Sequence, residues 1–336
     1  MKRNFGQICL ILAGIVFGIL AAEGLVRLFF PYSRDHVIPA GFFQIDADLG
    51  WKLKAGKSVT HHSRNFDVVY NTNILGYRDA PRKLPKEAMV YRILLYGDSQ
   101  IFGWGIPESQ RFSNIIEARQ SSLEILNLAV PGYGLDQQIL SYEKNGHFLD
   151  ADEVVFFIST DTLDRIRYDY IYRKYKPKFV ADQKGNLRAV LPPKLANVWT
   201  STLYDLLSPF YLPYFLDRRL AILMDMIKRP SKSHDEPQSD KDDGDIGDFE
   251  KQLIERVRNK AVERKHRLTI LTYLGERARN DLELFCKQKS IGYMAIVFAG
   301  KFDDLTISKE DHHWNVQAHK LIADQISSHF ELRINK

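Results

Sequence analysis

The sequence predicts an α/β protein with a central parallel sheet that is covered by helices on both faces. Two blocks carry this prediction, residues 91–164 and residues 266–330, because short apolar runs alternate with helical patterns in both. Runs that are apolar throughout, rather than alternating with polar residues, are typical of strands covered on both sides. Such strands joined by helices form a parallel sheet.

Each element of the two blocks follows from its own pattern. We expect five strands, at residues 92–99, 123–130, 153–159, 267–274 and 291–298. We expect helices between and after them, at residues 111–120, 135–148, 276–288 and 316–330.

The N-terminus carries an apolar stretch, from about residue 5 to residue 30, behind the basic pair Lys2 and Arg3. Its unbroken apolar part, residues 8–22, is shorter than the roughly 20 residues of a membrane span, so a cleavable signal and a buried helix of a soluble protein stay open. The stretch has no good small-x-small cleavage site, and apolar residues resume after Glu23. We therefore favour an uncleaved membrane anchor over residues 1–30. The basic end then places the rest of the chain outside the cytoplasm.

Composition divides the remainder of the chain. We expect a β-rich lead-in at residues 31–89, the first part of the α/β core at 90–164 and its second part at 266–336. The insertion between them, residues 165–265, is aromatic and basic at first and then apolar, which predicts a helical cap. Its stretch 231–248 has almost no apolar residues and predicts a disordered loop. The aromatic and basic run at its start, residues 165–178, is more typical of a solvated helix face that packs on a core than of a ligand groove.

Charge and cysteine content exclude several functions. The chain has 47 Lys and Arg against 42 Asp and Glu, and this excess is too small to indicate a nucleic-acid partner. The two cysteines, Cys9 and Cys286, lie in an apolar run and in a distant helix, so we expect no disulfide between them. No Cys/His/Asp cluster has the spacing of metal ligands, and no nucleotide, haem or flavin motif is present. We therefore expect no metal and no cofactor.

The end of the first core strand carries the first chemical motif, Tyr96-Gly97-Asp98-Ser99. Gly97 allows a sharp turn, and Ser99 then projects from the carboxyl end of the strand, where open α/β sheets place their sites. A Gly-Asp-Ser tripeptide alone is equally typical of a structural turn. The sequence QIFGWG that follows, residues 100–105, makes the motif more specific.

These motifs resemble the SGNH/GDSL hydrolase family, in particular its membrane-anchored bacterial members with G-D-S-x-x-F-G-W-G after the first strand. The resemblance covers about residues 71–161 and 266–323. It implies the SGNH hydrolase fold, a flavodoxin-like three-layer sandwich. It also implies that Ser99 is the nucleophile and that its N–H donates to the oxyanion.

Two further blocks concern the oxyanion hole. The segment NLAVPGYG, residues 127–134, matches the family segment whose glycine N–H joins the hole, and the resemblance gives this role to Gly132. After the third strand the family has Asn-Asp, whereas this chain has Ser159-Thr160-Asp161. Thr160 therefore stands where an amide donor is expected. Its hydroxyl is shorter and rotates freely, which implies weaker stabilisation, changed chemistry or a site that has lost activity.

The last block is Asp311-His312-His313-Trp314-Asn315, which precedes the final helix and resembles the family's Asp-x-His ending. In that role His313 takes the proton of the serine, and Asp311 orients the imidazole. Glu310, three residues before His313, is the alternative acid. His312 is expected to point elsewhere.

The resemblance implies an extracytoplasmic serine esterase or O-acyltransferase that works through an acyl-enzyme. Its expected substrate is an ester-linked acyl group on a cell-surface or exported carbohydrate, and acetyl is the acyl group that we favour. Two alternatives stay open. A lipid-like pocket built by residues 203–226 would make the protein a lipase or thioesterase, and a site inactivated at Thr160 would leave a polysaccharide-binding or assembly protein. The membrane is an expected partner, and no protein partner is indicated.

Overall fold

The structure is a computed structural model, and it describes most of the chain. The described residues are 2–32, 41–172, 174–193, 206–207, 209–216, 219–220, 223, 244–299 and 301–334. The loop predicted to be disordered falls mainly on residues 231–243, which lie outside the described residues.

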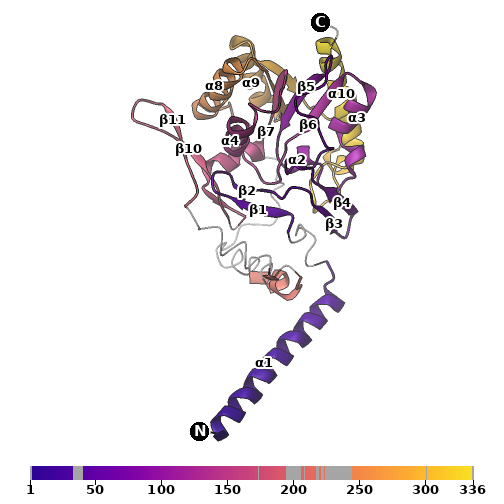
Figure 1. Cartoon of the computed structure of the whole chain (residues 1–336), viewed down its shortest axis with the longest axis vertical. Coiled ribbons are helices and arrows are strands. Elements are labelled where there is room, and N and C mark those ends of the chain that lie inside the picture. Colours follow the sequence, from indigo (N-terminus) through magenta and orange to yellow (C-terminus); the bar gives the residue numbers. More distant parts are fainter. Residues whose placement is uncertain are drawn as a thin grey trace.

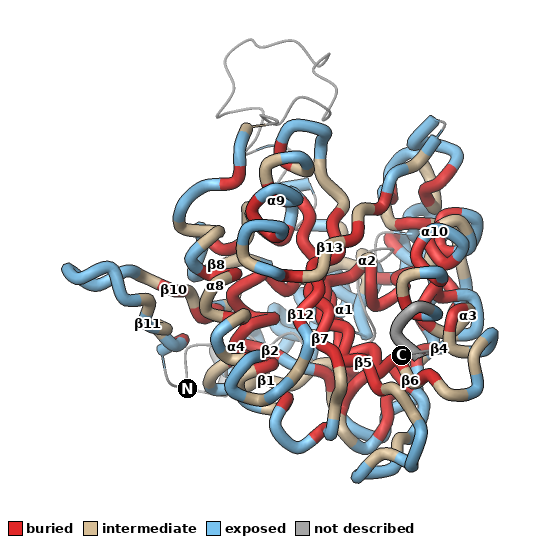
Figure 2. The backbone as a smooth tube through the Cα atoms, turned by 90° about the horizontal axis from the view of Figure 1, so that it is seen from above, coloured by how far each residue is buried: buried red, intermediate tan, exposed pale blue. Residues whose placement is uncertain are grey.

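Five parallel strands form the central sheet, in the order β13-β12-β7-β5-β6. They are β5 (Tyr91–Tyr96), β6 (Leu123–Asn127), β7 (Glu153–Ser159), β12 (Arg267–Tyr273) and β13 (Gly292–Ala295). Every residue of β7 is buried, which accounts for its unbroken apolar run, and Figure 2 shows the strands of the sheet as the buried centre of the molecule. The prediction of a parallel sheet is confirmed.

Helices cover both faces of this sheet (Figure 1). The helices α3 (Phe112–Arg119) and α10 (Val316–Ile334) pack on each other on one face. The other face carries α4 (Leu135–Asn145), α8 (Asp248–Glu263) and α9 (Glu276–Gln288). These layers make the predicted three-layer α/β sandwich.

The lead-in forms two antiparallel hairpins. The first pairs β1 (Phe43–Asp46) with β2 (Gly50–Leu53), and the second pairs β3 (Ser58–His62) with β4 (Asp67–Asn71). Trp51 of β2 is buried, and its Nε1 donates to the carbonyl of Pro131 at 3.1 Å. The hydroxyl of Tyr133 donates back to the Trp51 carbonyl at 2.6 Å. The lead-in is thus joined to the loop that follows β6.

The start of the insertion differs from the helical cap that we expected. After α5 (Thr160–Asp164) and a short 3-10 helix, η2 (Arg165–Arg167), it forms two hairpins. Their strands are β8 (Tyr170–Ile171), β9 (Lys174–Tyr175), β10 (Lys178–Ala181) and β11 (Leu187–Val190). The reason is local: the Asp182 carboxylate accepts from two loop amides, and Gly185 adopts a left-handed φ of 80°, which closes a tight turn. At the other end of the insertion, α8 packs against β12 and α4 as a helix of the core.

The N-terminal helix α1 (Lys2–Phe29) extends away from the α/β body (Figure 1). An 18-residue window within residues 5–29 has a mean hydropathy of 2.4, and only 6% of that window is buried. Because its apolar side chains are exposed, α1 is not a core helix of a soluble domain. It is a candidate membrane span or signal sequence.

One buried histidine of the fold makes stability depend on pH. His319 on α10 is 1% exposed, and its Nδ1 accepts from the Phe112 amide at 3.2 Å. Burial first, and the nearby positive charges of Arg111 and Arg78 second, lower its pKa to about 3. Its unfolded pKa is about 6.5, so the neutral form stabilises the fold above that pH, and this contribution is lost as the pH falls toward 3.

We therefore expect a His319→Gln variant, which keeps a side-chain acceptor but cannot titrate, to lose less stability than the wild type between pH 7 and pH 5. The difference is expected to approach about 1.4 kcal/mol per pH unit below pH 6.5. Urea unfolding at the two pH values measures it. The matched control is His312→Gln, because His312 is exposed. If His319→Gln lost as much stability as the wild type between pH 7 and pH 5, His319 would not be the source of the pH dependence.

Candidate active site

Ser99 lies at the carboxyl end of β5, as the first residue of the short helix α2 (Ser99–Phe102). The turn that places it there needs a glycine, since a Cβ at Gly97 would lie 2.3 Å from Cγ1 of Ile101. The Asp98 side chain caps α2 by accepting from the Gln100 amide at 3.0 Å. Ser99 is 8% exposed.

A chain of hydrogen bonds joins Ser99 to the last loop of the protein. Nε2 of His313 lies 2.9 Å from Oγ of Ser99, and Nδ1 of His313 lies 2.6 Å from Oδ1 of Asp311. The Asp311 carboxylate is 5% exposed and also accepts from the His313 amide at 3.2 Å. Glu310 contacts the hydroxyl of Ser308 instead, so Asp311 is the carboxylate that holds the imidazole.

Gln100 holds the histidine loop against the serine turn. Its Oε1 accepts from the Trp314 amide at 2.9 Å, and its Nε2 donates to the His312 carbonyl at 3.3 Å. Ser99 and His313 are 214 residues apart in sequence, and these two bonds flank His313 on both sides. Gln100 therefore fixes the distance across which the serine and the histidine meet.

Trp104 fixes the plane of the His313 ring. The two rings stack with centroids 5.1 Å apart and an interplanar angle of 21°. The buried ring of His61 meets Trp104 edge-on at 4.8 Å.

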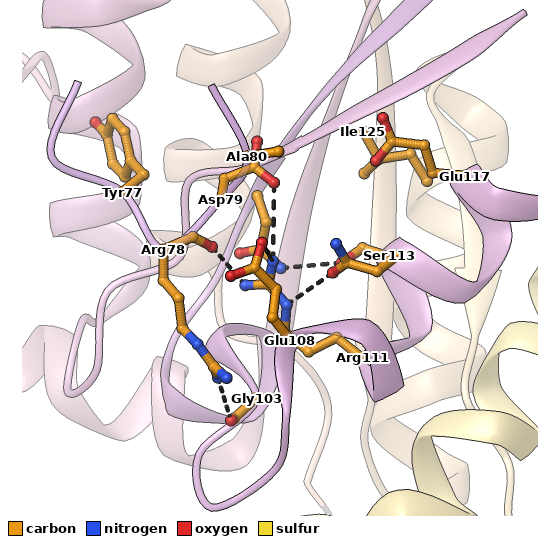
Figure 3. Close-up of polar contacts among 12 residues, drawn as sticks. Tyr77, Arg78, Asp79, Ala80, Gly103, Glu108, Arg111, Ser113, Glu117 and Ile125 are labelled. Atoms are coloured by element: carbon orange, nitrogen blue, oxygen red, sulfur yellow. Dashed lines mark hydrogen bonds and ion pairs between the residues drawn. The ribbon is translucent and has the colours of Figure 1, made fainter. Parts of the chain in front are cut away.

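The loop between α2 and α3 is shaped by two glycines and by buried arginines. Gly103 and Gly105 have left-handed φ values of 76° and 74°, which explains both glycines of the FGWG sequence. Arg78 donates to the carbonyls of Phe102 at 3.0 Å, of Gly103 at 2.6 Å and of Ile106 at 2.6 Å. Figure 3 shows the Arg78 side chain reaching Gly103. The Arg78 guanidinium therefore fixes this loop, and the sequence of the loop itself does not indicate that contact.

The residues expected to form the oxyanion hole lie at the same edge of the sheet. Gly132 follows β6 with φ of 83°, and a Cβ there would lie 3.0 Å from the Tyr172 ring and 3.3 Å from the Trp51 ring. Thr160 begins α5 directly after β7, and its side chain is exposed. Ser159, before it, is buried and caps α5 by accepting from the Thr162 amide at 3.3 Å. The oxyanion roles of Gly132 and Thr160 stay predictions.

Arg165 is an element of the site that the sequence pattern did not indicate. Its Nη1 lies 2.8 Å from Oδ2 of Asp98 and 3.2 Å from the Tyr133 carbonyl. Its side chain is 13% exposed, and that of Asp98 is 1% exposed. Arg165 thus joins the serine turn to the loop that carries Gly132, and it is not part of the solvated helix face that the run 165–178 predicted.

An Arg165→Met variant is expected to lose about 3 kcal/mol of unfolding free energy, because it leaves the buried Asp98 carboxylate without its charge partner. The matched control is Arg167→Met, which removes an exposed arginine two residues away. Urea unfolding of both variants measures the difference. Equal unfolding free energies of the two variants would show that the Arg165–Asp98 ion pair does not stabilise the fold.

No group of three or more His, Cys, Asp or Glu side chains with a metal-binding arrangement occurs among the residues that the structure describes. A serine hydroxyl bonded to an imidazole, whose other nitrogen is held by a carboxylate, is the arrangement that makes serine a nucleophile. On a parallel α/β sheet, this arrangement is that of serine hydrolases that work through an acyl-enzyme.

The chain is similar to solved structures of lipolytic proteins. A member of the lipolytic protein G-D-S-L family from Veillonella parvula is 12% identical, with 72% of this chain and 99% of that chain covered and a TM-score of 0.38. A putative lipolytic protein of the G-D-S-L family from Desulfitobacterium hafniense is 12% identical, with 70% and 98% covered and a TM-score of 0.40. The psychrotrophic esterase EstA from Pseudoalteromonas is 10% identical, with 73% and 99% covered and a TM-score of 0.41. At these values the likeness is distant. No protein-family model and no curated protein match the chain.

Proposed function

We propose that the protein is an SGNH-type serine esterase or O-acyltransferase whose α/β domain lies outside the cytoplasm, held at the membrane by α1. The observation that carries the chemistry is the hydrogen-bonded chain Ser99–His313–Asp311, with distances of 2.9 Å and 2.6 Å. The exposed apolar helix α1 behind Lys2 and Arg3 supports the location.

The first half of the reaction acylates the serine. His313 Nε2 takes the proton of Ser99 Oγ as Oγ bonds to the ester carbonyl carbon, and Asp311 stabilises the imidazolium that forms. The tetrahedral oxyanion accepts hydrogen bonds from the amides of Ser99 and Gly132 and from the hydroxyl of Thr160. The bond to the alcohol oxygen then breaks, and His313 returns the proton to that oxygen.

The second half releases the acyl group. His313 takes a proton from water or from an acceptor hydroxyl, whose oxygen attacks the acyl carbon of acyl-Ser99. When the second tetrahedral intermediate collapses, the acyl–Oγ bond breaks and Ser99 recovers its proton from His313. Water gives hydrolysis, and a sugar hydroxyl gives transfer to a new ester.

An O-acetylated carbohydrate is the substrate class that the surroundings favour. The exposed ring of Tyr172 lies against Gly132, and such a ring offers an apolar face beside a polar edge, which suits the CH face of a sugar. The alternative of a lipid pocket is less favoured, because the described residues 209–216 contact the end of α1.

A series of p-nitrophenyl esters from acetate to palmitate tests this proposal on the full-length protein. The proposal predicts that kcat/KM is highest for acetate and falls as the acyl chain lengthens. Highest kcat/KM on the long chains would favour the lipase or thioesterase alternative. No turnover of any ester by folded protein would favour a binding or assembly role.

A further inference from the structure

Two charged residues interrupt the outer part of α1, and both are engaged by one distant segment. Glu23 is 7% exposed, and its carboxylate accepts from Nε of Arg27 at 2.7 Å, from the Tyr211 amide at 2.9 Å and from the Leu212 amide at 2.8 Å. Arg27 donates from Nη2 to the carbonyl of Pro209 at 2.8 Å. Charged groups in an apolar span are costly unless they are paired, and this pair is satisfied by the segment.

Aromatic contacts extend the same junction. The rings of Phe30 and Phe215 are 4.7 Å apart, and the Arg219 guanidinium lies 5.2 Å from the Phe215 ring and 5.8 Å from the Phe30 ring. The Arg27 guanidinium lies 4.9 Å from the ring of Tyr211. Figure 1 shows this segment beside the end of α1, between α1 and the α/β body.

The docked segment exposes apolar side chains. We call its described residues within 206–223 the docked segment; residues 212–216, 219–220 and 223 are helical. Its exposed apolar residues are Leu206, Phe210, Leu216, Leu220 and Leu223, each between 41% and 66% exposed. The last three are each described as helical. An exposed apolar surface of this kind marks an interaction site.

The length of α1 indicates where the docked segment lies relative to the bilayer. Residues 5–22 precede Glu23 and span about 27 Å as a helix, close to the roughly 30 Å of a hydrocarbon core. Glu23 and the docked segment therefore lie at the outer boundary of the bilayer. Leu25, Leu28 and Phe29 of α1 are exposed at this same end, so both the helix and the segment present apolar side chains there.

We propose that the docked segment lies in the outer membrane–water interface and binds bilayer lipid through its leucines, so that α1 and the segment together hold the α/β domain at a fixed height. Helices with an apolar face and basic residues are stable in that interface. This inference rests on the proposed membrane location of α1 but not on the proposed acyl chemistry.

Lipid-based quenching of a fluorophore tests the proposal on the full-length protein in nanodiscs. In a Cys9→Ser background, a polarity-sensitive probe is attached to Leu216→Cys or Leu220→Cys, and the lipid carries a doxyl group near the head-group end of its acyl chain. The buried Cys286 stays unlabelled. The matched control is Val262→Cys, an exposed apolar position on α8. We expect the two leucine positions to be quenched several-fold more strongly than the control.

Two outcomes would overturn the proposal. A probe at Leu12→Cys, deep in α1, reports whether the anchor is inserted. If the probe at position 12 is quenched while the probes at 216 and 220 are quenched no more than the probe at position 262, the proposal is overturned. It is also overturned if those probes are shielded from both lipid and aqueous quenchers, since that indicates a protein occupant. A Glu23→Ala variant removes the contacts that join α1 to the docked segment, so it should lower quenching at position 216 and leave p-nitrophenyl acetate turnover unchanged. Loss of turnover in every sample would bear on the proposed acyl chemistry and not on this inference.

Discussion

A Ser99→Ala variant is expected to lose ester turnover by at least about a thousandfold in kcat, because removing the nucleophile of such a triad costs up to about a millionfold. The reason is that the acyl-enzyme has no oxygen on which to form. His313 and Asp311 stay in place, so the loss is chemical rather than structural. Steady-state hydrolysis of p-nitrophenyl acetate measures it.

The control for this variant is Ser109→Ala, which removes an exposed serine hydroxyl ten residues away. It should retain full turnover, and Ser99→Ala should unfold in urea within about 1 kcal/mol of the wild type. Full turnover by folded Ser99→Ala would show that another group carries the chemistry.

Asp311→Asn is expected to lower kcat by about ten-thousandfold, because an amide in place of the carboxylate favours the wrong tautomer of its histidine. In the structure Nδ1 of His313 lies 2.6 Å from Oδ1 of Asp311, so this bond sets which nitrogen faces Ser99. The same kinetic assay measures the effect.

Glu310→Gln is the matched control, since Glu310 is the neighbouring acid and its carboxylate contacts Ser308 instead of His313. We expect it to change kcat by less than about threefold, as an exposed substitution away from the reacting atoms. A large loss in Glu310→Gln with little loss in Asp311→Asn would reverse the assignment of the acid.

Local patterns in the sequence were sufficient to predict the core of the fold. The strands β5 and β7 are covered on both faces, and such strands carry an unbroken apolar signature that is visible without any partner. The resemblance of the Gly-Asp-Ser and Asp-x-His motifs to the SGNH/GDSL family implied the meeting of Ser99 with His313, and the structure places Oγ and Nε2 of these residues 2.9 Å apart.

Contacts between distant segments were not predictable in the same way. Arg165 lies in an aromatic and basic run whose composition is that of a solvated surface, and only the buried Asp98, 67 residues earlier, makes it part of the site. Gln100 likewise acts through a loop more than two hundred residues away. The hairpins at residues 170–190 depend on a local turn at Asp182 and Gly185 that composition alone did not separate from a helical cap.

Labelling with a fluorophosphonate serine probe tests the central claim most directly, because the reagent reacts with an activated serine whatever the natural substrate is. The full-length protein is treated alongside Ser99→Ala and His313→Ala, and the labelled peptide is mapped. The account predicts one adduct, on Ser99, that both substitutions abolish. Folded wild-type protein that takes no label, or label on another serine, would contradict it.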